Sequence, residues 1–158
     1  MADKLVEHPR LIPHDLYRQI LAVMPIVCVD LMVTDVDGKL LLLRRRDEPA
    51  KDQWWLPGGR VHLGETRVEA ALRKLNEECG LSPATCVCTE LLTADVILPD
   101  DQGSLSHGVT TVFRIEMSQA VTTLQLDLHS QTAEWRAPAA WLGEDLHPFV
   151  RRVVATVL

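Results

Sequence analysis

The sequence has no apolar run long enough to cross a bilayer, which argues against a membrane-spanning protein. Its longest apolar stretch, residues 26–33, is interrupted by Asp30, whereas a spanning helix needs about 20 consecutive apolar residues. The segment MADKLVEHPR at the start contains no hydrophobic stretch of the kind that directs secretion. We therefore expect a cytoplasmic protein that does not act on membranes.

Paired cysteine motifs are also missing. The four cysteines show no repeated C-x2-C spacing, so we expect no zinc site: Cys28, Cys79, Cys86 and Cys88. Because the chain lacks a recognisable secretion signal, we expect reduced thiols rather than a disulfide framework.

The chain lacks an excess of positive charge. It has 16 Lys and Arg against 22 Asp and Glu, which gives a formal net charge of −6. Phosphate backbones bind basic protein faces, so we do not expect nucleic acid as the main partner. A small phosphorylated ligand stays compatible with this charge, because it needs only a few local cations and a metal ion.

No repeat and no Gly/Ser-rich linker divides the 158 residues, of which 47% are apolar. A chain of this size can bury a substantial core. We expect one domain over residues 1–158, with an N-terminal helical extension at 1–24 and a core at 25–158.

The hydrophobic pattern predicts alternating strands and helices. An amphipathic helix is predicted at residues 13–23, and a central helix ends at Gly80 after the apolar stripe Val68, Leu72, Leu75 and Cys79. Strands are predicted at 26–34, 39–45, 85–97, 109–117 and 132–136, loops at 99–108 and 127–131, and a last helix at about 148–157. This alternation is typical of an α/β layered domain.

One face of the central helix carries the strongest chemical signal. At helical spacing, Lys74 lies between Glu77 and Glu78, away from the apolar stripe. Neighbouring carboxylates repel one another unless a cation is bound, and magnesium prefers such oxygen ligands. Gly58 and Gly59, just upstream, permit the tight backbone that could aim a carbonyl at a metal ion. The plain alternative is that the two acids are ordinary solvated side chains.

The spacing favours the metal site. Eight positions closely resemble the Nudix hydrolase signature G-x5-E-x7-R-E-U-x-E-E-x-G-U, in which U is a bulky aliphatic residue: Gly59, Glu65, Arg73, Leu75, Glu77, Glu78, Gly80 and Leu81. The resemblance implies an α/β/α sandwich with a mixed sheet and a central metal-binding loop and helix. It also implies Mg²⁺-dependent hydrolysis of a nucleoside diphosphate linked to another group, with Mn²⁺ as a substitute ion. Gly59, Glu65, Arg73 and Gly80 would then be structural.

Lys74 is the one departure from that signature, which has a third glutamate there. The lysine changes the formal charge of positions 74, 77 and 78 from −3 to −1. An ammonium close to a metal ion is repelled by it. We therefore expect fewer bound cations and no water activated at position 74.

The GDP-mannose mannosyl hydrolase branch of the Nudix enzymes also lacks this glutamate, and residues 25–113 are similar to it. The likeness lies in the segments PIVCVDLMV, GKLLLLRRRDEPAKDQWWLPGGRV and SHGVTTVFRI. The resemblance implies a nucleotide-sugar substrate, GDP-mannose-like, whose sugar C–O bond is cut. The N-terminal helix and exposed apolar residues could also build a homodimer, as in the similar enzymes.

The resemblance to this branch implies roles for individual residues. Asp30 and Arg45 would hold the leaving group or substrate, and Arg60 would stabilise the diphosphate as charge develops on it. The carbonyl of Gly58 and the carboxylates of Glu77 and Glu78 would bind magnesium, and Glu77 is also a catalytic candidate.

The resemblance also implies a general base. A histidine base on a late loop suggests His129, although alignment on Trp135 points to Ser130. His107, in the expected late strand, is the second histidine candidate.

Simpler interpretations stay open. Asp30 could pair structurally with an arginine, Arg45 could be solvated within its RRR run, and Trp54 and Trp55 could pack in the core instead of stacking on a base. A Nudix pyrophosphohydrolase that cuts P–O bonds is the main alternative, with a base from Glu90, Asp100, Asp101 or Glu116. The second alternative is a non-catalytic nucleotide-binding module.

Overall fold

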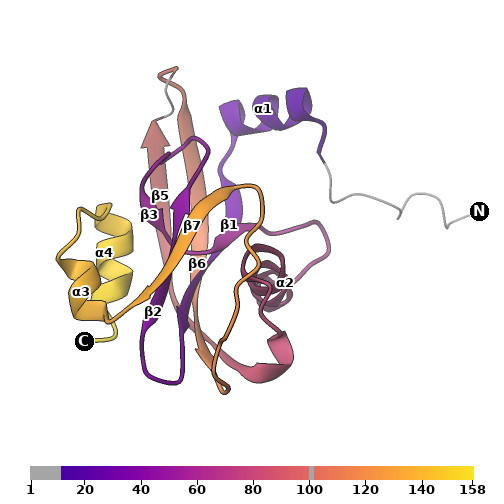
Figure 1. Cartoon of the computed structure of the whole chain (residues 1–158). Helices are drawn as coiled ribbons and strands as arrows, with labels where there is room; N and C mark the ends of the chain where they lie inside the picture. Colours follow the sequence, from indigo (N-terminus) through magenta and orange to yellow (C-terminus); the bar gives the residue numbers. More distant parts are fainter. Residues whose placement is uncertain (1–11, 100–101) are drawn as a thin grey trace, which may run out of the picture.

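The computed structural model describes residues 12–99 and 102–158 (Figure 1). Its elements in chain order are α1 (His14–Val23), β1 (Ile26–Thr34), β2 (Leu40–Arg45), β3 (Trp54–Trp55), β4 (Gly58–Arg60), α2 (Arg67–Cys79), a short 3-10 turn (Pro83–Thr85), β5 (Cys86–Pro99), β6 (Leu105–Met117), β7 (Ser130–Arg136), α3 (Pro138–Leu142) and α4 (Pro148–Ala155). Every helix within these residues is too short or too polar to cross a bilayer.

The seven strands form one mixed sheet. The order along its main path is β3-β2-β1-β6-β5, while β4 pairs with β1 and β7 pairs with β2. The central pair, β1 and β6, is parallel, with Val29 beside Thr111. The other pairs are antiparallel, and the short β4 places Gly58 directly opposite Asp30.

Apolar residues from both faces of the sheet make two separate cores. Val29, Leu31 and Val33 pack with α2 on one side, whereas Met32 packs with α3 and α4 on the other. Figure 1 shows α2 on one side of the sheet and the α3–α4 pair on the opposite side. The architecture is therefore the expected α/β/α sandwich.

The ends of α2 follow from local sequence. Thr66 and Glu69 form a reciprocal capping box, and Gly80 ends the helix in the left-handed conformation at φ 67°. The predicted apolar stripe is wrong at Val68, which is 47% exposed. Ala70, Ala71, Leu75 and Cys79 face the sheet together with Glu78, which accepts a hydrogen bond from the Gly58 N–H. Val68 is on the same side of the helix but lies in its first turn, ahead of these buried residues.

Several predicted boundaries are also wrong. β6 begins at Leu105, inside the predicted loop, because residues 105–108 pair with the end of β5. β7 begins at Ser130 through its pairing with Arg45. The helix α3 follows Pro138 and lies outside all the predicted elements.

Candidate active site

A cavity of about 220 Å³ lies between β1, β4, β6 and the C-terminal end of α2, which contributes Glu78. Its lining brings together sequence-distant candidates, namely Asp30, Arg45, Gly58, Gly59, Arg60, Glu78 and His129. A second, wider hollow of about 470 Å³ is lined by Arg73, Lys74 and Glu77. Tyr17, Arg60 and His129 line both hollows, so the cavity and the wider hollow adjoin.

Asp30 is one of two buried acids that line the cavity, the other being Glu78. Thr110 donates a hydrogen bond to its Oδ2 at 2.7 Å. Burial, more than any nearby charge, raises the pKa of Asp30 to about 7, and Glu78 adds to the rise while Arg45 opposes it. A Cβ on Gly58 would lie 2.8 Å from Asp30 Oδ1 and 2.3 Å from the Val29 carbonyl. Only glycine at position 58 therefore lets β4 approach this carboxyl.

Two arginines bring positive charge to the cavity. Arg45 is half-buried, whereas its neighbours Arg44 and Arg46 are exposed. Its Nε donates to the Pro49 carbonyl at 2.8 Å. Arg60 follows the two glycines of β4 and donates from Nη1 to the Val61 carbonyl at 3.4 Å. The two guanidinium groups are suited to bind a diphosphate, because phosphate oxygens accept several charge-assisted hydrogen bonds.

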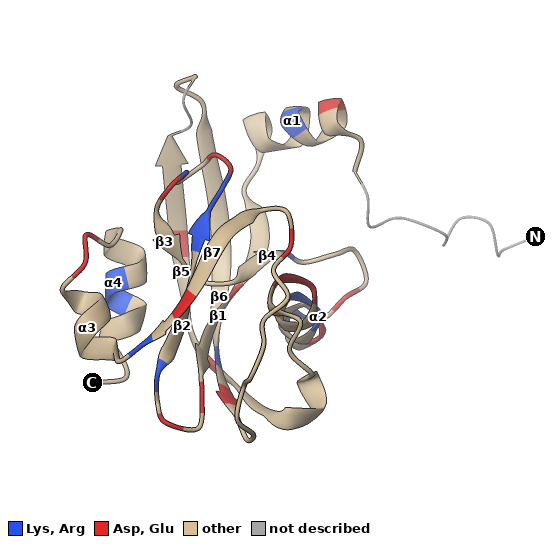
Figure 2. Cartoon of the chain, viewed as in Figure 1, with Lys and Arg blue, Asp and Glu red and all other residues tan. Residues whose placement is uncertain are grey.

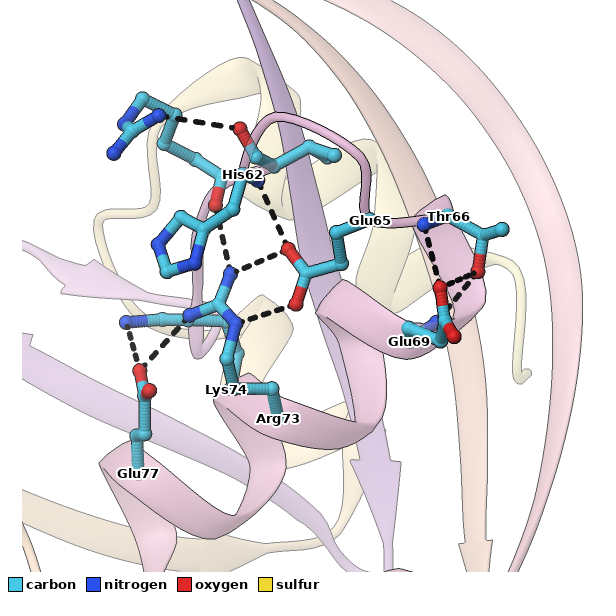
Figure 3. A network of polar contacts seen from close by, with 9 residues as sticks. His62, Glu65, Thr66, Glu69, Arg73, Lys74 and Glu77 are labelled. Atoms are coloured by element: carbon cyan, nitrogen blue, oxygen red, sulfur yellow. Dashed lines mark hydrogen bonds and ion pairs between the residues drawn. The ribbon is translucent and has the colours of Figure 1, made fainter. Parts of the chain in front are cut away.

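Glu65 and Arg73 join the loop after β4 to the middle of α2 (Figure 3). Arg73 donates to both oxygens of Glu65, at 2.6 and 3.0 Å. The same guanidinium donates to the Arg60 carbonyl at 2.9 Å and to Glu77 at 3.0 Å. Arg73 therefore fixes the strand that carries Arg60 relative to the acidic face of the helix.

Lys74 lies between the two acids, as the sequence predicts. Its Nζ is 2.9 Å from Glu78 Oε1 and 3.5 Å from Glu77 Oε2. Figure 2 shows basic and acidic positions mixed along α2. Glu78 is buried, which raises its pKa, and the ammonium of Lys74 is the strongest influence in the opposite direction. The acidic face of α2 is thus already neutralised in part by the protein's own cation.

The two candidate histidines are placed differently. His129 lies at the mouth of the site, where its Nδ1 is 2.8 Å from Asp47 Oδ2. Ser130, which the alignment on Trp135 favoured, is buried and lines the inner cavity. His107 is 3.2 Å from Asp95 and is not among the described residues that line either hollow, although its neighbours Ser106 and Gly108 are. Adjacent strand residues point to opposite faces, so His107 is directed away from the site.

The two tryptophans also occupy different places. Trp54 packs against Trp141 with ring centroids 5.0 Å apart and planes tilted by 58°, and it lies under the guanidinium of Arg136. Trp55 is buried against Phe149 and borders the cavity. Both tryptophans therefore pack with α3 and α4, and Trp55 also forms part of the cavity wall.

The sequence model of one protein family, the NUDIX domain, matches residues 24–157. The chain belongs to the Nudix family. It is 34% identical over 145 residues to the low-salt glycan biosynthesis protein Agl8 of Haloferax volcanii, covering 89% of this chain and 87% of that protein. It is 44% identical over 103 residues to the ADP-ribose pyrophosphatase of Methanocaldococcus jannaschii, covering 65% of this chain and 57% of that enzyme.

Solved Nudix structures share the fold. The MutT Nudix hydrolase of Burkholderia pseudomallei is 25% identical with a TM-score of 0.70, covering 85% of this chain and 99% of that one. The NUDIX domain of Shewanella oneidensis NrtR, solved with ADP-ribose, is 22% identical with a TM-score of 0.68, covering 91% and 96%. The family match and these neighbours support a Nudix hydrolase with the expected mixed sheet and helices.

Nudix hydrolases generally use divalent metal ions such as Mg²⁺, and binding such an ion requires oxygen donors in the site. Among residues 12–99 and 102–158, no three Asp, Glu, His or Cys side chains converge closely enough to hold a metal ion alone. Magnesium is often bound through one or two carboxylates together with substrate phosphates. Glu77 and Glu78 offer two such carboxylates, and Lys74 lies between them in this structure.

Two lining residues were missed from the sequence. Tyr17, in α1, borders both hollows, and burial raises its pKa. It is the only tyrosine of the chain, a weak signal within an otherwise ordinary amphipathic helix. Thr110, which donates to Asp30, had no signal at all, because a threonine is common in a strand.

Proposed function

We propose that this Nudix protein hydrolyses a nucleoside diphosphate sugar, GDP-mannose-like, at the bond between the sugar carbon and the diphosphate oxygen. The observation that carries the proposal is the position of Lys74. Its ammonium lies 2.9 Å from Glu78. At position 74 the family signature has instead a carboxylate that can activate water. A site with an ammonium there favours departure of a diphosphate over attack on phosphorus.

The cavity contains groups suited to that departure. Arg60 and Arg45 border it together with Asp30, and cationic donors stabilise the negative charge that develops on a leaving diphosphate. A magnesium ion, held by Glu77, Glu78 and the Gly58 carbonyl, would add further positive charge to the same oxygens. The glycan-biosynthesis name of the Agl8 relative is compatible with a sugar-containing substrate.

His129 is the proposed general base. Its Nδ1 is 2.8 Å from the Asp47 carboxylate, and a neutral His129 that donates from Nδ1 to Asp47 would accept a proton at Nε2. Water would attack the sugar carbon as the C–O bond to the β-phosphate breaks, and the proton of the water would pass to Nε2. The products are the free sugar and the nucleoside diphosphate.

Pyrophosphate cleavage is the competing function. Retention of Glu77 favours it, as do the names of relatives such as the ADP-ribose pyrophosphatase and the RNA pyrophosphohydrolase of Roseobacter denitrificans. Of the carboxylates proposed as its base, Glu90 pairs with Arg67 and Glu116 with Arg114, and both lie outside the residues lining the site. Asp100 and Asp101 lie outside the described residues.

Product analysis tests the proposal. The protein is incubated with MgCl₂ and a panel of GDP-, ADP- and UDP-sugars that includes GDP-mannose and ADP-ribose, and products are separated by anion exchange. Free sugar and nucleoside diphosphate are the expected products. Nucleoside monophosphate with sugar phosphate would favour pyrophosphate cleavage, and tight nucleotide binding without turnover would favour the non-catalytic module.

A further inference from the structure

We infer that Lys74 is a built-in competitor for the metal ion: it holds Glu77 and Glu78 until a diphosphate draws the ammonium away, so that metal and diphosphate bind as a coupled pair. The inference rests on the proposed function for its ligand, a nucleoside diphosphate group. It concerns the one residue by which this chain departs from its family's signature.

The first observation is the set of contacts around Glu78. One of its oxygens accepts the Gly58 N–H at 2.9 Å, and the other contacts Lys74 Nζ at the same distance. The side chains of Lys74 and Glu78 are only 13% and 11% exposed. Both oxygens of Glu78 therefore have a partner in the absence of ligand. Because the two side chains are mostly buried, little water can replace the ammonium as the partner of Glu78.

The second observation is that β4 leaves space for the lysine. A Cβ on Gly59 would lie 2.8 Å from Lys74 Cε and 3.2 Å from Nζ. Any other residue at position 59 would therefore press against the lysine stem. The stem of Lys74 therefore lies against the β4 backbone at Gly59, and only 13% of its side chain is exposed.

The third observation is where Lys74 can go. It borders the wider hollow together with Arg60 and His62, next to the proposed diphosphate position. An ammonium and a divalent cation repel each other at short range, so both cannot occupy the gap between Glu77 and Glu78. Phosphate oxygens would attract the ammonium into the hollow and so release both carboxylates.

The consequence is a thermodynamic coupling. If a diphosphate favours the released position of Lys74, it favours metal binding, and the metal must favour diphosphate binding by the same factor. Removal of the ammonium should weaken this dependence, because the carboxylates are then available at all times and only direct contact between metal and phosphate couples the two ligands.

The test is Mn²⁺ binding to the nucleotide-free protein, followed by electron paramagnetic resonance and repeated by calorimetry with Mg²⁺. Lys74→Met should bind Mn²⁺ about tenfold or more tightly than wild type, within the usual range of coupling. Lys74→Gln serves as a second neutral variant, and thermal melts in EDTA show which variants are folded. Lys74→Arg, which keeps the charge, and Lys39→Met, which removes an exposed charge elsewhere, should both stay close to wild type.

A second titration adds GDP or ADP. The nucleotide should tighten metal binding more strongly in wild type than in Lys74→Met, after correction for metal bound by the nucleotide itself. Equal Mn²⁺ affinity in wild type and both neutral variants would overturn the inference. A gain in affinity without any turnover of nucleotide sugars would support the inference and overturn the proposed function alone.

Discussion

The carboxylate of Glu65 receives two hydrogen bonds from the Arg73 guanidinium, at 2.6 and 3.0 Å, across the loop between β4 and α2. These hydrogen bonds are the main reason that the pKa of Glu65 falls to about 2, from an ordinary 4.5. Because the pair also fixes the backbone of Arg60, its loss should affect both stability and the cationic side of the site.

Glu65→Gln should lower the free energy of unfolding by about 2 kcal/mol at neutral pH, because it leaves a mostly buried guanidinium without its nearest charge partner and with only Glu77. The folded-state pKa is depressed, so the contribution is complete above pH 4.5 and is lost as pH falls towards 2. Urea unfolding at several pH values measures this. The exposed Glu116 is the matched control: its contact with Arg114 is 3.6 Å, and Glu116→Gln should cost less than about 1 kcal/mol. Equal costs for the two variants would contradict the bracing role.

Asp30→Asn should change the pH dependence of stability in the opposite sense. The pKa of Asp30 is raised from 3.8 to about 7, chiefly by burial. Between these values the unfolded chain has lost a proton that the folded chain keeps, so wild-type stability falls as pH rises. From about pH 4.5 to 7.5 the variant should gain at least about 1 kcal/mol relative to wild type. For the control Asp37→Asn, at an exposed position, the plot of unfolding free energy against pH should be parallel to that of wild type. A parallel plot for Asp30→Asn would refute the assignment of Asp30 as a buried acid.

His129→Gln should reduce kcat by about 100-fold, in the range of general base catalysis. His107→Gln should stay within about threefold of wild type, since His107 faces Asp95 and lies away from the lining of the site. Steady-state kinetics on the preferred nucleotide sugar compares them. The reverse ranking would exchange their roles, and a full rate for His129→Gln would return Ser130 to consideration.

Glu78→Gln should reduce turnover at least about 100-fold, because a neutral amide replaces the buried carboxylate proposed to hold magnesium. Glu90→Gln is the control, since Glu90 pairs with Arg67 outside the site. Rates are compared at saturating MgCl₂. A near-wild-type rate for Glu78→Gln would remove the metal assignment, and a large loss in Glu90→Gln would support pyrophosphate cleavage with Glu90 as base.

The regular elements were predictable where local pattern determines them. Apolar runs predicted β1 and β2, and Gly80 predicted the end of α2, whereas the capping box at its start is known only from the structure. The two-residue β3 and three-residue β4 were not predicted, because they exist only through pairing with β2 and β1. The burial of Glu78 could not be predicted either, because its hydrogen-bond partner, Gly58, is 20 positions away in the chain.

The site was predictable to the extent that it lies in one short segment. Fixed spacing on one loop and helix placed Glu65, Arg73, Lys74, Glu77 and Glu78 correctly relative to one another. The histidines could not be ranked, because which face of β6 meets the cavity depends on its register with β1 and β5. The contact of Thr110 with Asp30 joins residues 80 positions apart, beyond any local pattern.

Hydrolysis in ¹⁸O-labelled water tests the proposed chemistry most directly. Products from the best nucleotide sugar are analysed by mass spectrometry after a single turnover, with unlabelled water as the reference. Attack on carbon predicts that the label is found in the released sugar and that the nucleoside diphosphate is unlabelled. Label in a phosphate product would contradict the account and place the attack on phosphorus.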